Sequence, residues 1–232
     1  NSKSQITVRI LEWDRDTEIS EDWWRARIIN AIKSREHIKN TDSIRLVYSE
    51  GDFIPGLIID KYSEYLIVQI LSLGIEMNKE MIIKIFVDLI HPKGVYERVD
   101  EKIKELEGLS GISQIAFGEI PEEIVINENG NKFSVNIKDG QKTGFYLDQR
   151  ENREYVKRYS EGRKVLDCFS FTGGFSVYAL KFGAESVSLV DSSEESLKIA
   201  MKNFELNGVS NKEIKILHCD AFQELRKFRD RG

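Results

Sequence analysis

The chain has 232 residues, 41% of them hydrophobic and 10% aromatic, which is typical of one or two compact globular domains. Its two distant cysteines, with no companion histidine cluster, suggest neither a disulfide framework nor a structural zinc site, and no metal is expected. No apolar run reaches the roughly 18 residues of a membrane span. The formal net charge of −5 argues against a protein that coats nucleic acid, although it does not exclude a local basic patch.

The first half of the chain predicts a small α+β domain. Residues 5–12 alternate apolar and polar side chains like a short strand, and Ser20 is placed to cap a helix over residues 21–36. Trp24 and Ile28 recur at helical spacing and are expected in the core. Apolar segments bounded by turn residues then predict a strand meander over 44–48, 57–60 and 65–71, a helix over 78–90 and a strand over 95–99.

A hairpin is predicted over residues 123–137. Its turn is Asn129-Gly130, two residues that tolerate the positive φ angles of a tight turn. The hairpin is expected to introduce a second domain.

From Lys164 onward, strands and helices alternate, which predicts a parallel sheet covered by helices. Ser192 and Glu195 have the spacing of a capping box before the second helix, and Gly208 is placed to end it. The expected strands are 164–169, 186–191 and 214–220, and the expected helices are 176–183, 196–208 and 222–232.

The loop after the first parallel strand is the most informative segment. In an open α/β sheet a ligand binds outside the carboxyl ends of the strands, which here means residues 167–174. Gly173 and Gly174 would let the backbone approach it closely, but two adjacent glycines do not form the dinucleotide pattern G-x-G-x-x-G. Asp167, at the strand end, suits a ligand with a positive charge and would repel phosphates.

Two more aspartates end the following strands. Asp191 lies 17 residues after Gly174, where a carboxylate can accept hydrogen bonds from both ribose hydroxyls. Asp220 can accept from the exocyclic amine of an adenine. Taken singly, such residues are more often helix caps or surface residues. Together with the glycine loop they predict an adenosine-containing cofactor, with a nicotinamide-dependent oxidoreductase as the alternative.

The runs GQKTGFYLDQREN and VLDCFSFTGGFSVYAL resemble the RlmI-like family of bacterial large-subunit ribosomal RNA cytosine-5 methyltransferases. The resemblance implies a class I methyltransferase with a partial Rossmann-like α/β domain, preceded by a small α+β domain and the tail of a PUA-like domain. The implied limits are 1–14 for the PUA-like remnant, 15–135 for the middle domain and 136–232 for the methyltransferase domain.

The resemblance also implies S-adenosylmethionine as cofactor, ribosomal RNA as partner and a cytoplasmic location; it leaves a homodimer open. The candidate cofactor-binding residues are Gln149, Arg150, Asp167, Phe169, Ser170, Gly173, Gly174, Asp191, Ser192, Asp220 and Ala221. Lys142 and Tyr146 are candidates for facing the substrate, although their loop could equally serve to pack Phe145 against the sheet.

The sequence departs from the family in two places. Residues 127–130 read Asn-Glu-Asn-Gly where the family commonly has Glu-Glu-His-Gly. The family continues past the position of Gly232 to an Asp-Pro-Pro-Lys-Phe motif and a catalytic cysteine, so this chain is expected to be inactive as it stands. Cys168 and Cys219 are expected to be structural. A guanine-modifying ribosomal RNA methyltransferase and a non-catalytic RNA-binding module remain as alternatives.

Overall fold

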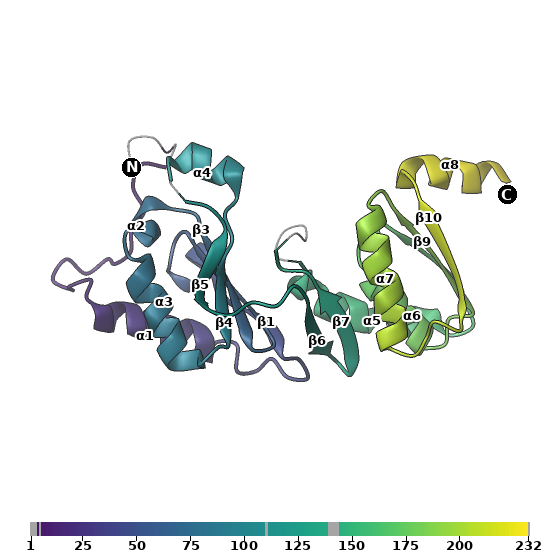
Figure 1. The fold of residues 1–232 in the computed structure, drawn as a ribbon, viewed down its shortest axis with the longest axis horizontal. Helices are drawn as coiled ribbons and strands as arrows, with labels where there is room; N and C mark the ends of the chain where they lie inside the picture. The colour runs from purple at the N-terminus through teal and green to yellow at the C-terminus, as the bar shows by residue number, and fades with distance from the viewer. Residues whose placement is uncertain (1–3, 5, 110, 139–143, 232) are drawn as a thin grey trace. The chain divides into compact units, whose positions relative to one another are not determined.

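A computed structural model describes residues 4, 6–109, 111–138 and 144–231 (Figure 1). The chain forms two compact units. The first comprises residues 1–124 and 137–143, and the second comprises residues 125–136 and 144–232. No helix within the described ranges is long and apolar enough to cross a membrane.

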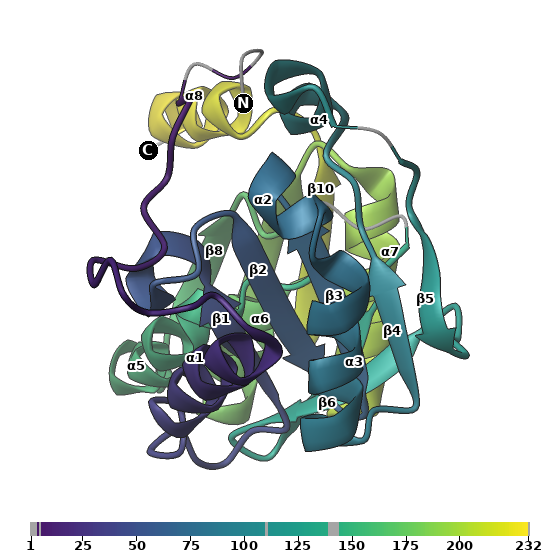
Figure 2. The ribbon, with the colours of Figure 1, turned by 90° about the vertical axis from the view of Figure 1, so that its left-hand side faces the viewer.

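The first unit is a five-stranded sheet in the order β1-β2-β3-β4-β5, with α1 and α3 in front of it in Figure 2. The predicted antiparallel meander is confirmed for β1, β2 and β3, and β4 runs parallel to β3. The strands are β1 (Ser43–Tyr48), β2 (Leu57–Tyr62), β3 (Tyr65–Ile70), β4 (Gly94–Glu97) and β5 (Gln114–Gly118). The helices are α1 (Glu21–Lys33), α2 (Leu73–Glu76), α3 (Lys79–Ile90) and α4 (Glu101–Glu107), with a short 3-10 helix at Ser49–Asp52.

Helix α1 shows how the sequence builds this core. Ser20 caps it as predicted, because its side chain accepts a hydrogen bond from the backbone N–H of Trp23. Trp24 and Ile28 then fall on one face of the helix, where they are buried in a cluster that includes Phe86 of α3.

The first unit differs from the sequence prediction in several features. The strand expected over residues 5–12 was wrong for the described residues 6–12, which are irregular. Ile6, Val8 and Ile10 are each more than half exposed, so their alternation does not reflect burial against a partner strand. Helix α4 and strand β5 were not predicted; β5 is an exposed edge strand, where hydrophobic alternation is a weak signal.

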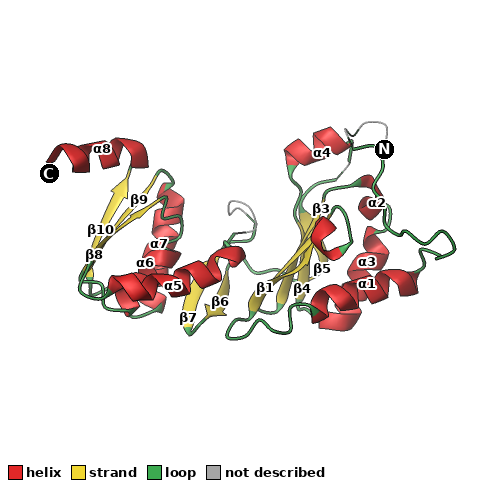
Figure 3. Cartoon of the chain, turned by 180° about the vertical axis from the view of Figure 1, so that it is seen from behind, coloured by secondary structure: helices red, strands yellow, loops and turns green. Residues whose placement is uncertain are grey.

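The second unit contains the predicted hairpin and the predicted parallel sheet. The sheet has the order β10-β9-β8, and α6 and α7 lie along one side of it in Figure 3. The hairpin strands are β6 (Ile124–Glu128) and β7 (Asn131–Val135), and the sheet strands are β8 (Lys164–Cys168), β9 (Ser186–Asp191) and β10 (Glu213–His218). The helices are α5 (Arg150–Ser160), α6 (Gly174–Lys181), α7 (Glu194–Leu206) and α8 (Ala221–Arg231), with a 3-10 turn at Leu147–Gln149 before α5.

The parallel register brings the carboxyl ends of the three strands to one edge. Cys168 of β8 pairs with Val190 of β9, and Asp191 of β9 pairs with His218 of β10. The backbone N–H of Cys219 continues this line by donating to the Asp191 carbonyl at 3.1 Å. The residues that follow the strands are therefore neighbours, as the sequence predicted.

The hairpin packs on α7 and belongs to the second unit. Asn203 Oδ1 accepts from the backbone N–H of Ser134 at 2.8 Å, and Asn207 Oδ1 accepts from that of Lys132 at 3.0 Å. These amides take up backbone groups of β7 that would otherwise lack a partner strand. The sequence had assigned residues up to 135 to the middle domain; the limits of the three expected domains remain a proposal.

Candidate functional site

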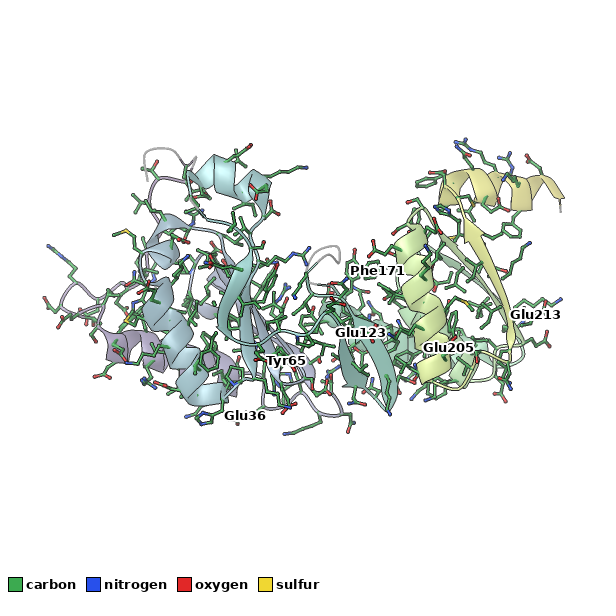
Figure 4. All side chains as sticks on the ribbon, in the orientation of Figure 1. Glu36, Tyr65, Glu123, Phe171, Glu205 and Glu213 are labelled. Atoms are coloured by element: carbon green, nitrogen blue, oxygen red, sulfur yellow. The ribbon has the colours of Figure 1, made fainter. Side chains whose placement is uncertain are left out.

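The loop that joins β8 to α6 has an unusual backbone. Phe169 and Phe171 have φ angles of 58° and 49°, although neither is glycine. Such residues cost about 1–3 kcal/mol each and persist only where their surroundings hold them. Here the backbone N–H of Phe171, labelled in Figure 4, donates to Asp191 Oδ2 at 2.8 Å, and that of Ser170 donates to the Val190 carbonyl at 3.1 Å. The loop is therefore tied to the end of β9.

The two glycines of the loop make room for other parts of the protein. A Cβ atom on Gly173 would lie 2.9 Å from Cβ of Ala200 in α7, and the φ of Gly173 is 71°. A Cβ atom on Gly174 would lie 3.0 Å from Cδ of Arg153. Packing alone explains the absence of both side chains, so the glycines by themselves are weaker evidence for a ligand than the sequence suggested.

Asp167 and Asp191 lie close enough to influence each other. Burial raises the pKa of Asp167 from 3.8 to about 6, and the negative charge of Asp191 adds to this rise. The Ser176 hydroxyl opposes it by donating to Asp167 Oδ2 at 2.7 Å. The contacts described for both carboxylates come from hydroxyl or backbone N–H donors, and they leave the negative charge without a cation.

Asp191 also shapes the start of α7 and corrects a detail of the prediction. Its Oδ1 accepts from the backbone N–H of Ser193 at 2.9 Å, which holds Ser193 in the cap position. Ser193, not Ser192, caps the helix by accepting from the Ser196 N–H. Ser192 is exposed, and its carbonyl lies 3.0 Å from Nε2 of His218.

Asp220 is an exposed residue at the start of α8. Its Oδ1 accepts from the backbone N–H of Gln223 at 2.8 Å, so it has the helix-capping role that aspartates often have. Ala221, which follows it, is buried, while Phe222 is 61% exposed. The Phe222 ring meets Phe169, also 61% exposed, with ring centroids 5.5 Å apart. The sequence reasoning missed Phe222, although its place directly after Asp220 and Ala221 could have suggested it.

Ser170 supplies a test of whether this loop fits a ligand. Its side chain is buried, yet its Oγ has no hydrogen-bond partner within the described part of the chain. Buried hydroxyls are usually paired, so this atom is available to an additional polar group. The residues present fit a ligand with a positive charge, because this hydroxyl belongs to the loop that is bonded to Asp191, and the described contacts of Asp167 and Asp191 include no cation.

The remaining candidates lie at or before the start of α5. Gln149 Oε1 accepts from Asn152 at 2.9 Å, and Arg150 lies within 3.5 Å of Glu151. Tyr146 packs edge-on against Phe171, with centroids 5.3 Å apart. Lys142 lies outside the described residues. Phe145 packs against Phe133 of the hairpin, with centroids 5.0 Å apart.

Cys168 is not activated as a nucleophile by its surroundings. Burial and the neighbouring charge of Asp167 raise the pKa of the Cys168 thiol, which lowers its thiolate fraction at neutral pH. The other cysteine, Cys219, donates from Sγ to Oε2 of Glu224 at 3.9 Å.

A cavity of about 340 Å³ lies elsewhere, in the first unit. It is lined by the irregular N-terminal segment and α2, including Arg9, Pro55 and Met77, and by none of the candidate site residues. At the strand ends of the second unit, the features that indicate a ligand are the loop after β8 and the neighbouring carboxylates.

Comparison with known proteins decides which kind of ligand this unit serves. Residues 110–232 match the model of a family described as S-adenosylmethionine-dependent methyltransferase. The chain belongs to this family. The match covers the hairpin, the strained loop and the strands β8, β9 and β10 of the second unit.

Individual relatives agree with this assignment. The chain is 40% identical over 237 residues to ribosomal RNA large subunit methyltransferase I of Aeromonas hydrophila, covering 100% of this chain and 60% of that protein. It matches a solved structure assigned as a SAM-dependent methyltransferase from Streptococcus mutans with a TM-score of 0.82, at 26% identity over 94% of this chain and 57% of that one. A methyltransferase structure in complex with SAH matches equally, with a TM-score of 0.82 and 26% identity.

These findings confirm the resemblance and the cofactor predicted from the sequence. S-adenosylmethionine is the cofactor of the family, which decides against the nicotinamide alternative. The mixed α/β fold of the methyltransferase is confirmed as well. The chain spans about 60% of the length of the curated relatives it matches.

Proposed function

We propose that this chain is the donor-binding part of an enzyme that methylates large-subunit ribosomal RNA, at C5 of a cytosine. The observation that carries the proposal is the strained loop after β8, tied to Asp191 and containing the unpaired Ser170 hydroxyl. The relatives, which are ribosomal RNA large subunit methyltransferases I, support the choice of RNA as substrate. Such a substrate would place the protein in the cytoplasm.

Each carboxylate suits a different part of the donor. Asp167 would attract the methionyl amine, Asp191 would accept from the ribose hydroxyls, and Asp220 would accept from the adenine amine. When bound, S-adenosylmethionine supplies an electrophilic methyl group. The chain's own residues orient it: the loop backbone approaches it closely, and the exposed rings of Phe169 and Phe222 offer apolar surface beside Asp220.

We assign the other candidate residues to positions around these three carboxylates. Gly173, Gly174, Ser192 and Ala221 would contact the donor through backbone atoms. Gln149 and Arg150 would lie near it, and Lys142 and Tyr146 would face the substrate. These roles remain proposals that mutagenesis can test.

Methylation at cytosine C5 needs a thiolate that attacks the ring and makes C5 nucleophilic. Cys168 is a poor candidate, since its thiol pKa is raised, so we assign the described residues to donor binding rather than to that attack. Guanine methylation, which needs no such thiolate, is the alternative reaction. A homodimer is a separate hypothesis that light scattering can check.

Calorimetric titration of the purified chain with S-adenosylmethionine, and separately with NADH, tests the proposal. We expect binding of the first ligand and none of the second; NADH binding alone would refute the proposal. Asp191→Ala should weaken donor binding at least tenfold, about 1.4 kcal/mol for a lost hydrogen-bonded carboxylate.

Two variants make this result specific. Asp191 also holds the N–H groups of Phe171 and Ser193, so Asp191→Asn, which keeps an acceptor, separates loss of charge from loss of loop shape. Glu205→Ala, an exposed carboxylate on α7, should leave affinity unchanged. Equal affinity of the wild type and Asp191→Ala would show that the pocket is misassigned.

A further inference from the structure

A buried ion pair joins the hairpin to α5. Arg153 Nε donates to Glu128 Oε1 at 2.7 Å, and Arg153 Nη2 donates to Glu128 Oε2 at 2.6 Å. Their side chains are only 3% and 2% exposed. In the sequence, Arg153 lies close to the basic residues Arg150, Lys157 and Arg158. Because its side chain is buried, Arg153 does not contribute to a basic surface.

Other groups complete this buried network. The Tyr178 hydroxyl of α6 donates to Glu128 Oε1 at 3.1 Å and lies 3.2 Å from the Glu128 carbonyl. Burial, with the charge of Glu128, raises the pKa of Tyr178, so the hydroxyl stays protonated. The Arg153 guanidinium lies over the Phe145 ring, 4.4 Å from its centroid.

The network reaches the strained loop from two directions. Arg153 Nη2 donates to the Tyr146 carbonyl at 3.0 Å, and the Tyr146 ring packs edge-on against Phe171. At the other end of the loop, Cδ of Arg153 fills the space that a side chain on Gly174 would need. One arginine therefore supports both Phe171 and the first residue of α6.

A buried ion pair alone is a poor way to gain stability. Removing two charges from water costs about as much as their attraction returns, and apolar replacements are often as stable. A loop with two non-glycine residues at positive φ, however, must be held by its neighbours. The directional bonds of a guanidinium can fix such a shape, whereas apolar packing fixes it less specifically.

We propose that Glu128 and Arg153 are positioning residues that hold the loop at residues 169–174 in the shape that receives the donor. The consequence for donor binding rests on the proposed function, but the support of the loop does not. This role falls on Glu128, which matches the family pattern, and not on Asn127 or Asn129, where the sequence departs from it. The glutamate supplies the contact, and Asn129-Gly130 makes the turn.

Hydrogen exchange on the full chain without cofactor tests the support of the loop directly. Glu128→Gln removes the charge from one partner and should make the amides of residues 170–174 exchange at least tenfold faster, as expected for a local opening. Amides of β9 residues 187–190 should keep their rates. Tyr146→Leu removes the ring that touches Phe171 while retaining the carbonyl, and should give the same result at an unchanged melting temperature.

Ile126→Val is the matched control, because it weakens a buried contact on the same hairpin without touching the pair. It should leave exchange at residues 170–174 unchanged. If Glu128→Gln unfolds the unit, Tyr146→Leu decides the question. Unchanged loop exchange in Tyr146→Leu and in folded Glu128→Gln, or equal acceleration in the Ile126→Val control, would refute the inference.

Titration with S-adenosylmethionine then measures the consequence. We expect Tyr146→Leu and Glu128→Gln to weaken binding severalfold, with Ile126→Val unchanged. If the wild type itself binds no donor, the proposed function fails, while the exchange rates still decide whether the pair supports the loop. Faster loop exchange with unaltered affinity would overturn the positioning role.

Discussion

The carboxylates at the strand ends of the second unit differ from the buried carboxylates of the first unit in the groups that hold them. In the first unit, Asp60 is fully buried and receives two bonds from Arg45, at 2.7 and 2.9 Å. Glu97 is likewise held by Lys79 at 3.2 Å. At the strand ends of the second unit, Asp167 and Asp191 are held by hydroxyl and backbone N–H donors.

The difference separates carboxylates that serve the fold from carboxylates that are available to a ligand. A paired carboxylate has its charge compensated within the protein and needs nothing more. Desolvation disfavours the charged form of a carboxylate that has no cation beside it, so its pKa rises. A cationic ligand would stabilise the charged form. This contrast distinguishes the two groups without any reference to known proteins.

The largest effect is expected where a paired charge loses its partner. Arg45→Met leaves the Asp60 carboxylate buried and unpaired, and should lower the free energy of unfolding by about 2–3 kcal/mol, less than for a fully buried pair because Arg45 is partly exposed. Urea unfolding of the whole chain measures it. Arg25→Met, which breaks the partly exposed pairs of Arg25 with Glu21 and Asp88, is the control and should change stability very little, because exposed ion pairs contribute little. Equal losses of stability in Arg45→Met and Arg25→Met would contradict the special role of the buried Asp60 pair.

Removing the charge of Asp167 should have the opposite sign. Its raised pKa means that the folded state holds a proton more tightly than the unfolded state. This stabilisation is fully present below about pH 4 and is lost as pH rises through about 6. Asp167→Asn should therefore match the wild type near pH 4 and be more stable at pH 7.5, by on the order of 2 kcal/mol. Urea unfolding at both pH values checks this; lower stability at pH 7.5 would contradict it.

The smallest expected effect is the pH dependence of S-adenosylmethionine binding through Asp167. Only the ionised form of Asp167 attracts an amine, so affinity for S-adenosylmethionine should rise up to about tenfold between pH 5 and pH 7 and then level off. In Asp167→Asn this slope should vanish while overall affinity falls, although the protein is more stable at neutral pH. Calorimetry across the pH range measures both. A wild-type affinity that does not change with pH would detach Asp167 from the donor.

Local signals predicted much of the fold. Short-range patterns in the sequence are sufficient to predict the cap and the apolar face of α1 and the turn at Asn129-Gly130. The alternation of strands and helices after Lys164 likewise predicted the parallel sheet and the convergence of its ends. The cap of α7 shifted by one residue because the Asp191 side chain, rather than a capping box, sets where the helix begins.

Long-range pairing could not be predicted in the same way. Glu128 and Arg153 are 25 residues apart, and nothing in either segment indicates that a hairpin glutamate meets an arginine of α5. The sequence also could not show why a glycine stands at position 174, because the side chain that packs against it, Arg153, belongs to another helix. Edge strand β5 was missed although Ile115 and Phe117 alternate along it, and both side chains remain exposed in the structure.

The bonds between the hairpin and α7 have a consequence for synthesis on the ribosome. Ser134 and Asn203 are 69 residues apart, and Lys132 and Asn207 are 75 apart. At about 5–20 residues per second, the hairpin is synthesised roughly 3–15 s before its partner helix. A lone two-stranded hairpin is marginal in water, so a chaperone that shields β7 during this interval would favour correct assembly.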